Sequence, residues 1–259
     1  MFIDSHCHLD FYEKEELPEI LNRAEKTNVK YMLNACASKN SFDKILKIIA
    51  DYKNVFGAIG IHPHEAEDMG SPISEDELLL YINKSKKIIA IGETGLDYSR
   101  ENINKDIQME NLYNHIVVAQ KTDLPLIIHN RDSNEDMINI LTEGMKKSPF
   151  KCIIHCFTAD EYMAKKMLDL DFFISASGIT TFKNSIPLQE VFKNVVPLQK
   201  MLIETDSPYL APVPYRGSQN EPSFVVEVAK KLSLLKNIST EDIGNITSNN
   251  FKTLFDLDI

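Results

Sequence analysis

Short apolar segments alternate with longer amphipathic segments along the whole chain, and this alternation limits the possible folds more than any other feature. The apolar segments, rich in Ile, Val, Leu and Phe, are predicted to be strands at residues 2–6, 29–36, 55–61, 87–92, 124–129, 151–156, 171–176 and 200–205. The amphipathic segments are predicted to be helices at residues 15–26, 41–52, 74–85, 105–121, 133–147, 159–169, 186–194, 221–235 and 240–255. Near-continuous apolar strands separated by helices indicate a parallel sheet that is buried on both faces.

Eight strands, each followed by a helix, predict a (β/α)8 barrel, the TIM-barrel architecture, which typically takes about 250 residues. The length of 259 residues fits this fold. A doubly wound open sheet is the alternative, but no GxGxxG fingerprint follows the first predicted strand. No linker or low-complexity tract interrupts the sequence, so we expect one domain over residues 1–259. Ser74 and Thr240 are expected to cap two of the helices.

Six of the seven histidines fall at or just beyond the C-terminal end of a predicted strand, and only His115 lies inside a predicted helix. The six are His6, His8, His62, His64, His129 and His155. Glu93 follows the fourth predicted strand, and Asp206 follows the eighth. In a barrel these positions meet at one rim, the end that carries the active site. Imidazole and carboxylate groups that converge from several strands indicate a metal site.

The spacing of these residues suggests roles for some of them. His6 and His8 are two residues apart, so both point to the same side of an extended strand and can reach one ion. The Glu93 carboxylate could bridge two cations, or it could be a buried carboxylate paired with Arg or Lys. Asp206 could bind a metal and accept a proton from water. Glu204, two residues earlier, is a buried hydrogen-bond partner or a catalytic group.

Other polar residues of the rim are candidates for substrate contacts or for structural roles. Arg131 could hold phosphate oxygens with its guanidinium fork, or could form a salt bridge. His62 and His64 could donate to substrate, cap the backbone, or support a metal ligand from behind. Asp97 is expected to be solvated or to cap a loop. Three further groups are expected to be structural or outside the site: Asp4, Asp10 and the four thiols of Cys7, Cys36, Cys152 and Cys156.

The charge and the termini restrict the partners and the location of the protein. Lys and Arg number 28 against 38 Asp and Glu, a net charge of −10, which argues against a broad basic surface for nucleic acid. No signal sequence or membrane span is evident, and no CxxC pair occurs. We therefore expect a cytoplasmic protein with free thiols, no membrane contact and no obligatory protein partner.

Six motifs resemble, in order and spacing, those of the TatD-type metal-dependent deoxyribonucleases of the amidohydrolase superfamily. They are IDSHCHLD, GIHPH, IGETGLDY, IIHNRD, IIHCF and IETDSPYLAP, and the resemblance extends to the terminal NNFKTLF. The resemblance implies a (β/α)8 barrel with two divalent metals. It implies that His6, His8, Glu93 and Asp206 bind one metal, and that Glu93, His129 and His155 bind the second. Zn, Mn and Mg remain open as the metals.

The resemblance also implies hydrolysis of phosphodiester bonds in DNA. Asp206 and Glu93 would be catalytic, with His62, His64 and Arg131 at the substrate. The acidic balance favours an exonuclease that acts on single-stranded or frayed ends, helped by base stacking on Tyr98, Phe157 or Tyr209. Two alternatives remain: the same site could hydrolyse a small amide, lactone or ester, or the protein could bind metal without catalysis.

Overall fold

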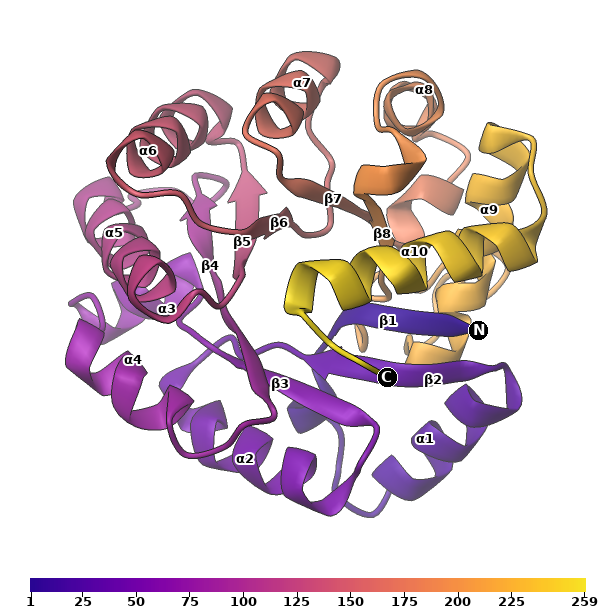
Figure 1. Ribbon diagram of the computed structural model, residues 1–259, viewed down its shortest axis with the longest axis horizontal. Coiled ribbons are helices and arrows are strands. Elements are labelled where there is room, and N and C mark those ends of the chain that lie inside the picture. The colour runs from indigo at the N-terminus through magenta and orange to yellow at the C-terminus, as the bar shows by residue number, and fades with distance from the viewer.

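The computed structural model describes all 259 residues, and its eight parallel strands follow one another around the sheet in chain order. The strands are β1 Phe2–Cys7, β2 Val29–Asn34, β3 Val55–Ile59, β4 Ile88–Asp97, β5 Leu126–Arg131, β6 Cys152–Ile154, β7 Phe173–Ala176 and β8 Met201–Ile203. Helices surround the sheet as an outer ring (Figure 1). The predicted (β/α)8 barrel is therefore confirmed.

Ten α-helices follow or connect these strands. They are α1 Leu17–Lys26, α2 Phe42–Asp51, α3 Pro63–Met69, α4 Glu75–Ile82, α5 Lys105–Thr122, α6 Asn134–Lys147, α7 Glu161–Asp169, α8 Ile186–Asn194, α9 Val225–Lys236 and α10 Thr240–Phe255. The predicted helices all exist, but α3 was not predicted. None of the ten combines the length and the apolar character that a bilayer crossing requires.

Backbone hydrogen bonds between the end of β1 and the segment after β8 bring the first and last strands of the sheet together. The backbone N–H of Asp206 donates to the carbonyl of His6 at 2.9 Å, and that of His8 donates to the carbonyl of Ser207 at 2.8 Å. Asp4 adds a side-chain bridge, because its carboxylate accepts from the backbone N–H of Thr205 at 2.9 Å. This contact fits the structural role expected of Asp4, and the bonds around it place His6 and His8 beside Asp206.

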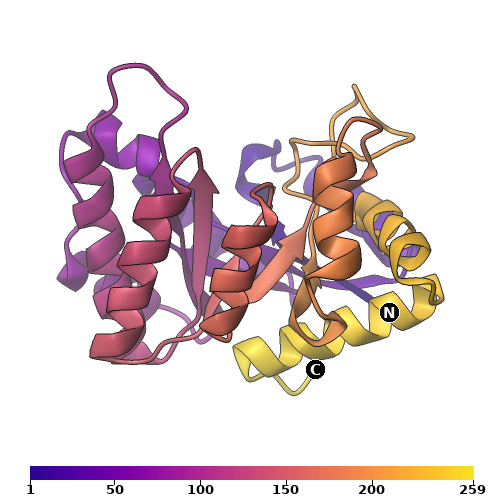
Figure 2. The same cartoon turned by 90° about the horizontal axis from the view of Figure 1, so that it is seen from above.

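The interior of the barrel is apolar at one end and polar at the other. Side chains from every strand fill the apolar end, and Phe251, Leu254 and Phe255 of α10 pack against them. Figure 1 shows α10 lying across this mouth, and Figure 2 shows the long loops after β4 and β8 at the opposite end. The polar side chains at the C-terminal ends of the strands therefore gather at the mouth that α10 leaves open.

Helix α5 fixes the segment that leaves β3. His115 Nε2 accepts the backbone N–H of Ile61 at 3.1 Å, and its Nδ1 lies 2.6 Å from the carbonyl of Asn111. The Asn111 amide donates to the carbonyl of Ile61 at 2.9 Å. These contacts require a neutral imidazole, and burial lowers the pKa of His115 to about 4. His115 therefore positions the chain directly before His62.

The buried His115 predicts a specific loss of stability in acid. The unfolded chain protonates this imidazole near pH 6.5, whereas the folded chain resists protonation until about pH 4. Stability from this group is complete above pH 6.5 and should fall by about 3 kcal/mol between pH 7 and pH 4. Urea unfolding of the wild type and of His115→Gln, at several pH values between 7 and 4, measures the free energy of unfolding of each protein. The stability difference between the two proteins should shrink over this range, and a constant difference would contradict the assignment.

Candidate metal centre

Four ligand-type atoms cluster around the end of β1, the middle of β4 and the loop after β8. The Nε2 atoms of His6 and His8 are 3.3 Å apart. The distance from Glu93 Oε2 is 3.3 Å to His6 Nε2 and 3.6 Å to His8 Nε2. The distance from Asp206 Oδ1 is 3.6 Å to His6 Nε2 and 3.4 Å to His8 Nε2. We call His6, His8, Glu93 Oε2 and Asp206 donor set A.

The second oxygen of Glu93 faces a different group of histidines. Glu93 Oε1 lies 2.8 Å from His155 Nε2 and 3.0 Å from His129 Nδ1. Its distance to His62 Nε2 is 3.7 Å. We call Glu93 Oε1, His129 and His155 donor set B. Glu93 is thus the one side chain that belongs to both sets, with one oxygen in each.

The spacing of these atoms suits metal ions. Two ligands of one tetrahedral ion, with bonds of about 2.0–2.2 Å, are roughly 3.3–3.6 Å apart, the range of the distances that involve His6 and His8 in donor set A. In donor set B, one atom from each of Glu93, His129 and His155 lies within 4.8 Å of the others, close enough to reach one ion. The buried His155 Nε2 atom lies 2.8 Å from Glu93 Oε1 without good hydrogen-bond geometry, and a cation between them would pair with both groups. The residues present therefore fit a divalent cation in each set.

The histidines keep the carboxylates ionised. Burial alone would raise the pKa of the Glu93 carboxyl, but His155, His129 and His6 outweigh it and hold that pKa well below its ordinary value. Burial is likewise outweighed at Asp206, where His8 and His6 lower the pKa of the carboxyl. Burial and the neighbouring His129 lower the pKa of His62 to about 3, so this imidazole is neutral. The carboxylates in turn outweigh burial and raise the pKa of His8 to about 9, and they raise the pKa values of His129 and His155 as well, so a bound cation would displace protons from these imidazoles.

Two glycines allow Glu93 to approach β5. Gly92 has a φ of +137°, and a Cβ atom there would lie 2.7 Å from the carbonyl oxygen of Ile127. Gly95 has a φ of +149°, and its Cβ would collide with the carbonyl oxygen of His129. A side chain at either position would push β4 away from β5. These glycines therefore bring Glu93 and His129 into one donor set.

Groups behind the histidines fix their orientation. His8 Nδ1 lies 3.0 Å from the carbonyl oxygen of Ala35. His155 Nδ1 lies 3.4 Å from Glu204 Oε1, which also accepts the backbone N–H of Cys156 at 2.6 Å. Glu204 is therefore a buried hydrogen-bond partner, one of the two roles left open for it. Such contacts present the opposite ring nitrogen to a metal.

Asp97 is more important than the sequence suggested. The expectation of a solvated carboxylate is wrong, because only 2% of Asp97 is exposed. Its Oδ2 lies 2.9 Å from His129 Nε2, which leaves His129 Nδ1 facing Glu93. The Oδ1 atom also accepts the backbone N–H of Ser99 at 2.9 Å, so the expected loop cap is present. Asp97 therefore orients the ring of His129.

Removing the charge of Asp97 should weaken donor set B. Asp97→Asn leaves the side chain in place but removes the carboxylate that holds the His129 ring. We expect metal affinity or activity to fall about 10- to 100-fold. Isothermal titration of the metal-stripped variant measures the affinity, with Asp136→Asn on α6 as the control. Unchanged affinity and activity in Asp97→Asn would contradict the orienting role.

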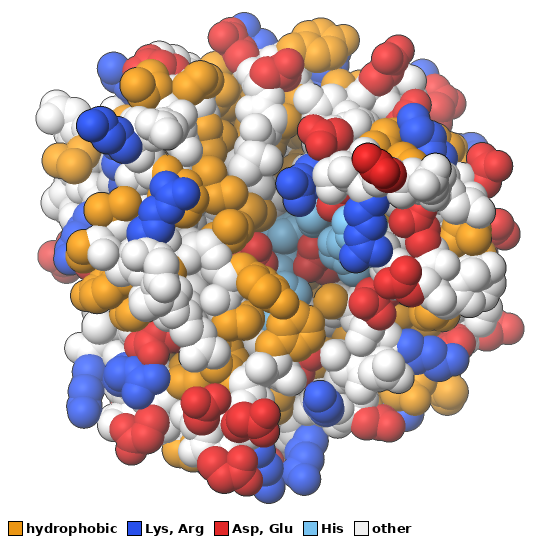
Figure 3. Space-filling view, turned by 180° about the vertical axis from the view of Figure 1, so that it is seen from behind, with side chains coloured by type: hydrophobic (Ala, Val, Ile, Leu, Met, Phe, Trp, Pro, Cys, Tyr) orange, Lys and Arg blue, Asp and Glu red, His pale blue; other side chains and the backbone are white.

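The donor sets form the floor of a hollow of about 690 Å³, a size that suits a ligand comparable to a nucleotide. Figure 3 shows its histidines in a central depression, with basic, acidic and hydrophobic side chains around it. The three residues expected at the substrate, His62, His64 and Arg131, all line it. Arg131 is exposed and forms no ion pair, so the salt-bridge alternative is not realised. Arg100, which the sequence did not single out, lies on the same hollow.

His62 and His64 have a local role besides lining the hollow. Pro63 begins α3, and His62 precedes it as the N-cap, with Nδ1 accepting the backbone N–H of His64 at 3.2 Å. The expected capping alternative is thus present. His64 Nε2 also lies 3.4 Å from Asp97 Oδ1.

The four cysteines stay out of the donor sets. All are free thiols. Cys156 does border the hollow, but its Sγ donates to Ser177 Oγ at 3.2 Å. The expectation that no thiol contributes a ligand agrees with this geometry.

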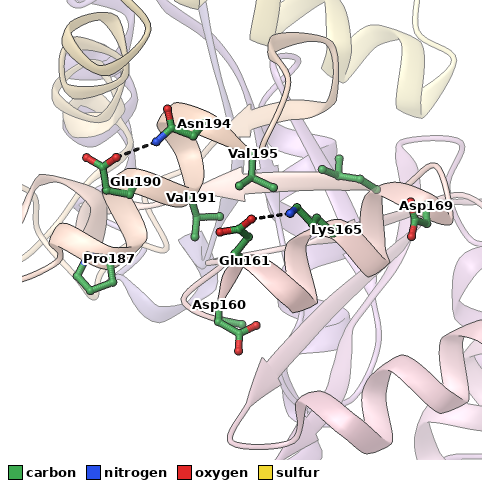
Figure 4. Close-up of a pocket in the computed structure, with 11 residues that line it drawn as sticks. Asp160, Glu161, Lys165, Asp169, Pro187, Glu190, Val191, Asn194 and Val195 are labelled. Carbon is green, nitrogen blue, oxygen red and sulfur yellow. Dashed lines mark hydrogen bonds and ion pairs between the residues drawn. The ribbon is translucent and has the colours of Figure 1, made fainter.

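A second hollow, between α7 and α8, lacks these features. Figure 4 shows polar and charged side chains that line it, four of which form two pairs. Lys165 lies 2.5 Å from Glu161, and Asn194 donates to Glu190 at 2.8 Å. No histidine lines it. The candidate site is therefore the hollow above the donor sets.

Comparison with known proteins agrees with this choice. The model of the family described as "TatD related DNase" matches residues 3–256. An uncharacterized metal-dependent hydrolase of Buchnera aphidicola is 42% identical over 261 residues, which cover 98% of this chain and 96% of that protein. YabD of Bacillus subtilis, also an uncharacterized metal-dependent hydrolase, is 37% identical over 98% of this chain and 99% of its own. The crystal structure of YjjV, a TatD homolog of Escherichia coli, superposes with a TM-score of 0.90 at 25% identity, covering 99% of this chain and 98% of YjjV.

Proposed function

Because this chain belongs to the TatD-related DNase family of metal-dependent hydrolases, we propose that it cleaves phosphodiester bonds in DNA. The substrate is the end of a single strand or a frayed duplex, and the mode is exonucleolytic. The observation that carries the proposal is the carboxylate of Glu93, which offers one oxygen to each of two donor sets. Two cations held side by side in this way are a recurrent arrangement for phosphodiester hydrolysis.

The chain's own residues supply the remaining parts of the reaction. When bound, two divalent cations lower the pKa of a water molecule and polarise a phosphoryl oxygen. Asp206 is ionised and its side chain is 15% exposed to the hollow, so its carboxylate can accept the proton of the attacking water. As the water oxygen bonds to phosphorus, the bond to the departing 3′ or 5′ oxygen breaks. Arg131, with His62 or His64, stabilises the charge on the phosphate.

The donor chemistry restricts the choice of metal. Donor set A has two imidazoles and two carboxylates, and donor set B has two imidazoles and one carboxylate. Nitrogen-rich sets favour Zn or Mn, whereas the carboxylates and a phosphate substrate accept Mg. We propose two cations per chain, one in each set.

The acidic character of the chain limits how it binds DNA. A net charge of −10 disfavours a long grip on duplex DNA, whereas the positive charge of two cations is concentrated where one phosphate binds. We therefore propose transient, modest binding to one strand end, without a membrane or an obligatory protein partner. We also propose a cytoplasmic location, where reducing conditions suit the free thiols.

Digestion of end-labelled oligonucleotides tests the proposed function. The enzyme should shorten single-stranded DNA from an end in the presence of Mg, Mn or Zn, and should cleave blunt duplex DNA more slowly. A panel of small amides, lactones and esters, assayed with the same preparation, tests the alternative substrate class. Turnover of that panel without cleavage of DNA would overturn the nuclease proposal.

A further inference from the structure

Two aromatic side chains stand exposed on one wall of the hollow. Phe11 follows β1 and Tyr209 follows β8, and 41% and 54% of their surfaces are exposed. The ring of Phe11 stacks on that of His8, with centroids 5.0 Å apart and 14° between the planes. The ring of Tyr209 stands edge-on to Phe11 at 6.2 Å. Phe11 and Tyr209 therefore form an aromatic pair next to donor set A, with the ring of Phe11 against that of His8.

The other aromatic residues considered for base stacking do not face the hollow. Phe157 is 2% exposed, so the expectation that it stacks on a base is wrong. The Tyr98 hydroxyl donates to Asp136 at 2.8 Å, and the ring lies under Lys105 Nζ at 3.9 Å. Only Tyr209 of the three expected residues lines the hollow, and Phe11 joins it.

Two arginines lie on the opposite wall, where Arg100 is also 3.8 Å from Asp68 Oδ2. Arg100 lies in the loop after β4, and Arg131 ends β5. The strand order places β4 and β5 across the barrel from β8 and β1. The two arginines and the aromatic pair therefore face each other with the donor sets between them.

We propose that Phe11 and Tyr209 bind the base of the terminal nucleotide of a single strand, while Arg131 contacts the phosphate that is cleaved and Arg100 holds the phosphates of the strand behind it. This assignment of the two walls rests on the proposed nuclease function. A terminal nucleotide needs one phosphate at the donor sets and carries only sugar and base beyond it, which matches an apolar wall. The rest of the strand adds one negative charge per nucleotide, which matches Arg100.

The aromatic pair also accounts for a single-strand preference. Aromatic rings stack on any base, because every base has a π-face, so the contact is independent of sequence. A base inside a duplex is already stacked and paired, and extruding it costs a few kcal/mol. The terminal base of a single strand avoids most of this cost.

Cleavage of matched oligonucleotides measures the contribution of the aromatic pair. The substrates are end-labelled single strands whose terminal nucleotide, at either end, carries its base or is abasic. The wild type should cleave the abasic end about 10- to 100-fold more slowly in kcat/KM. The double variant Phe11→Ala/Tyr209→Ala should lose a similar factor on the intact end and should hardly distinguish the two substrates. Tyr162→Ala, at a 62% exposed tyrosine of α7, is the matched control and should behave as the wild type.

A binding measurement separates this proposal from the nuclease proposal. Metal-loaded protein is titrated into a single strand with a terminal 2-aminopurine, attached through a phosphorothioate linkage that slows cleavage. The wild type should quench the fluorescence, and the double variant should not. The base-binding role would be overturned if the double variant still preferred the intact end over the abasic end as strongly as the wild type does. It would also be overturned if the wild type did not quench the fluorescence. Quenching without cleavage of any DNA would instead contradict only the nuclease function.

Discussion

Glu93→Gln should abolish nearly all hydrolytic activity, with a loss in kcat/KM of about 10⁴-fold, or roughly 5 kcal/mol of transition-state stabilisation. The amide keeps the size of the side chain but loses the negative charge that both donor sets share. One substitution therefore weakens both metal positions at once, which distinguishes Glu93 from every other residue of the site. Metal content should fall from two ions per chain to one or fewer.

Activity on end-labelled single-stranded DNA and metal analysis by mass spectrometry measure this result. Glu65→Gln is the matched control, because Glu65 lines the same hollow but belongs to neither donor set. Thermal unfolding shows whether the variant stays folded. A Glu93→Gln protein that keeps two metals and activity within tenfold of the wild type would contradict the bridging role.

Asp206→Asn should lower kcat by about 10²- to 10⁴-fold, with a smaller effect on KM, because the variant lacks the carboxylate that we propose accepts the proton of water. Asp206 has a φ of +56°, a left-handed conformation that asparagine also adopts, so the loop after β8 should keep its shape. The amide oxygen can still face His8, which should leave part of the metal affinity of donor set A intact.

Steady-state kinetics and metal titration of the same preparation separate the two effects. Asp132→Asn is the control, because Asp132 lies in a rim loop, also has a positive φ of 55°, and lies outside the donor sets. A loss of activity in Asp206→Asn that extra metal fully restores would mean that the residue only binds metal. The proton-accepting role would then be wrong.

The barrel could be predicted from the sequence because each strand is an apolar segment that lies between segments whose apolar residues have the spacing of a helix. The positions of His6 and His8 follow from the period of two along β1, and Asp206 follows from the end of β8. The fourth strand was expected to end at residue 92, but it runs to Asp97. Glu93 and Asp97 are an even number of residues apart, so their side chains lie on the same face of the longer strand and both point toward His129.

The helix α3 was missed because the segment around Pro63 looks like the end of a strand. Proline at the first position of a helix, preceded by a residue whose side chain caps it, is in fact a typical helix start. The N-cap at Ser74 is confirmed, whereas Ser239 rather than Thr240 caps α10. A capping side chain must lie just before the first helical residue, and adjacent serine and threonine offer two equivalent choices.

Contacts that depend on burial were the least predictable. Phe11 is an apolar residue after β1, and nothing in the local pattern indicates that it stays exposed on the hollow. Phe157 has a similar place after β6 but packs against Phe192 in the core. The difference depends on how distant helices pack over each residue, which local spacing does not determine.

The most direct measurement is a titration of metal-stripped enzyme with Mg, Mn or Zn while cleavage of end-labelled single-stranded DNA is followed. The shared carboxylate of Glu93 predicts no cleavage without metal and full activity only as the second equivalent binds. Cleavage by the metal-free protein, or full activity at one equivalent per chain, would contradict a two-metal site bridged by Glu93.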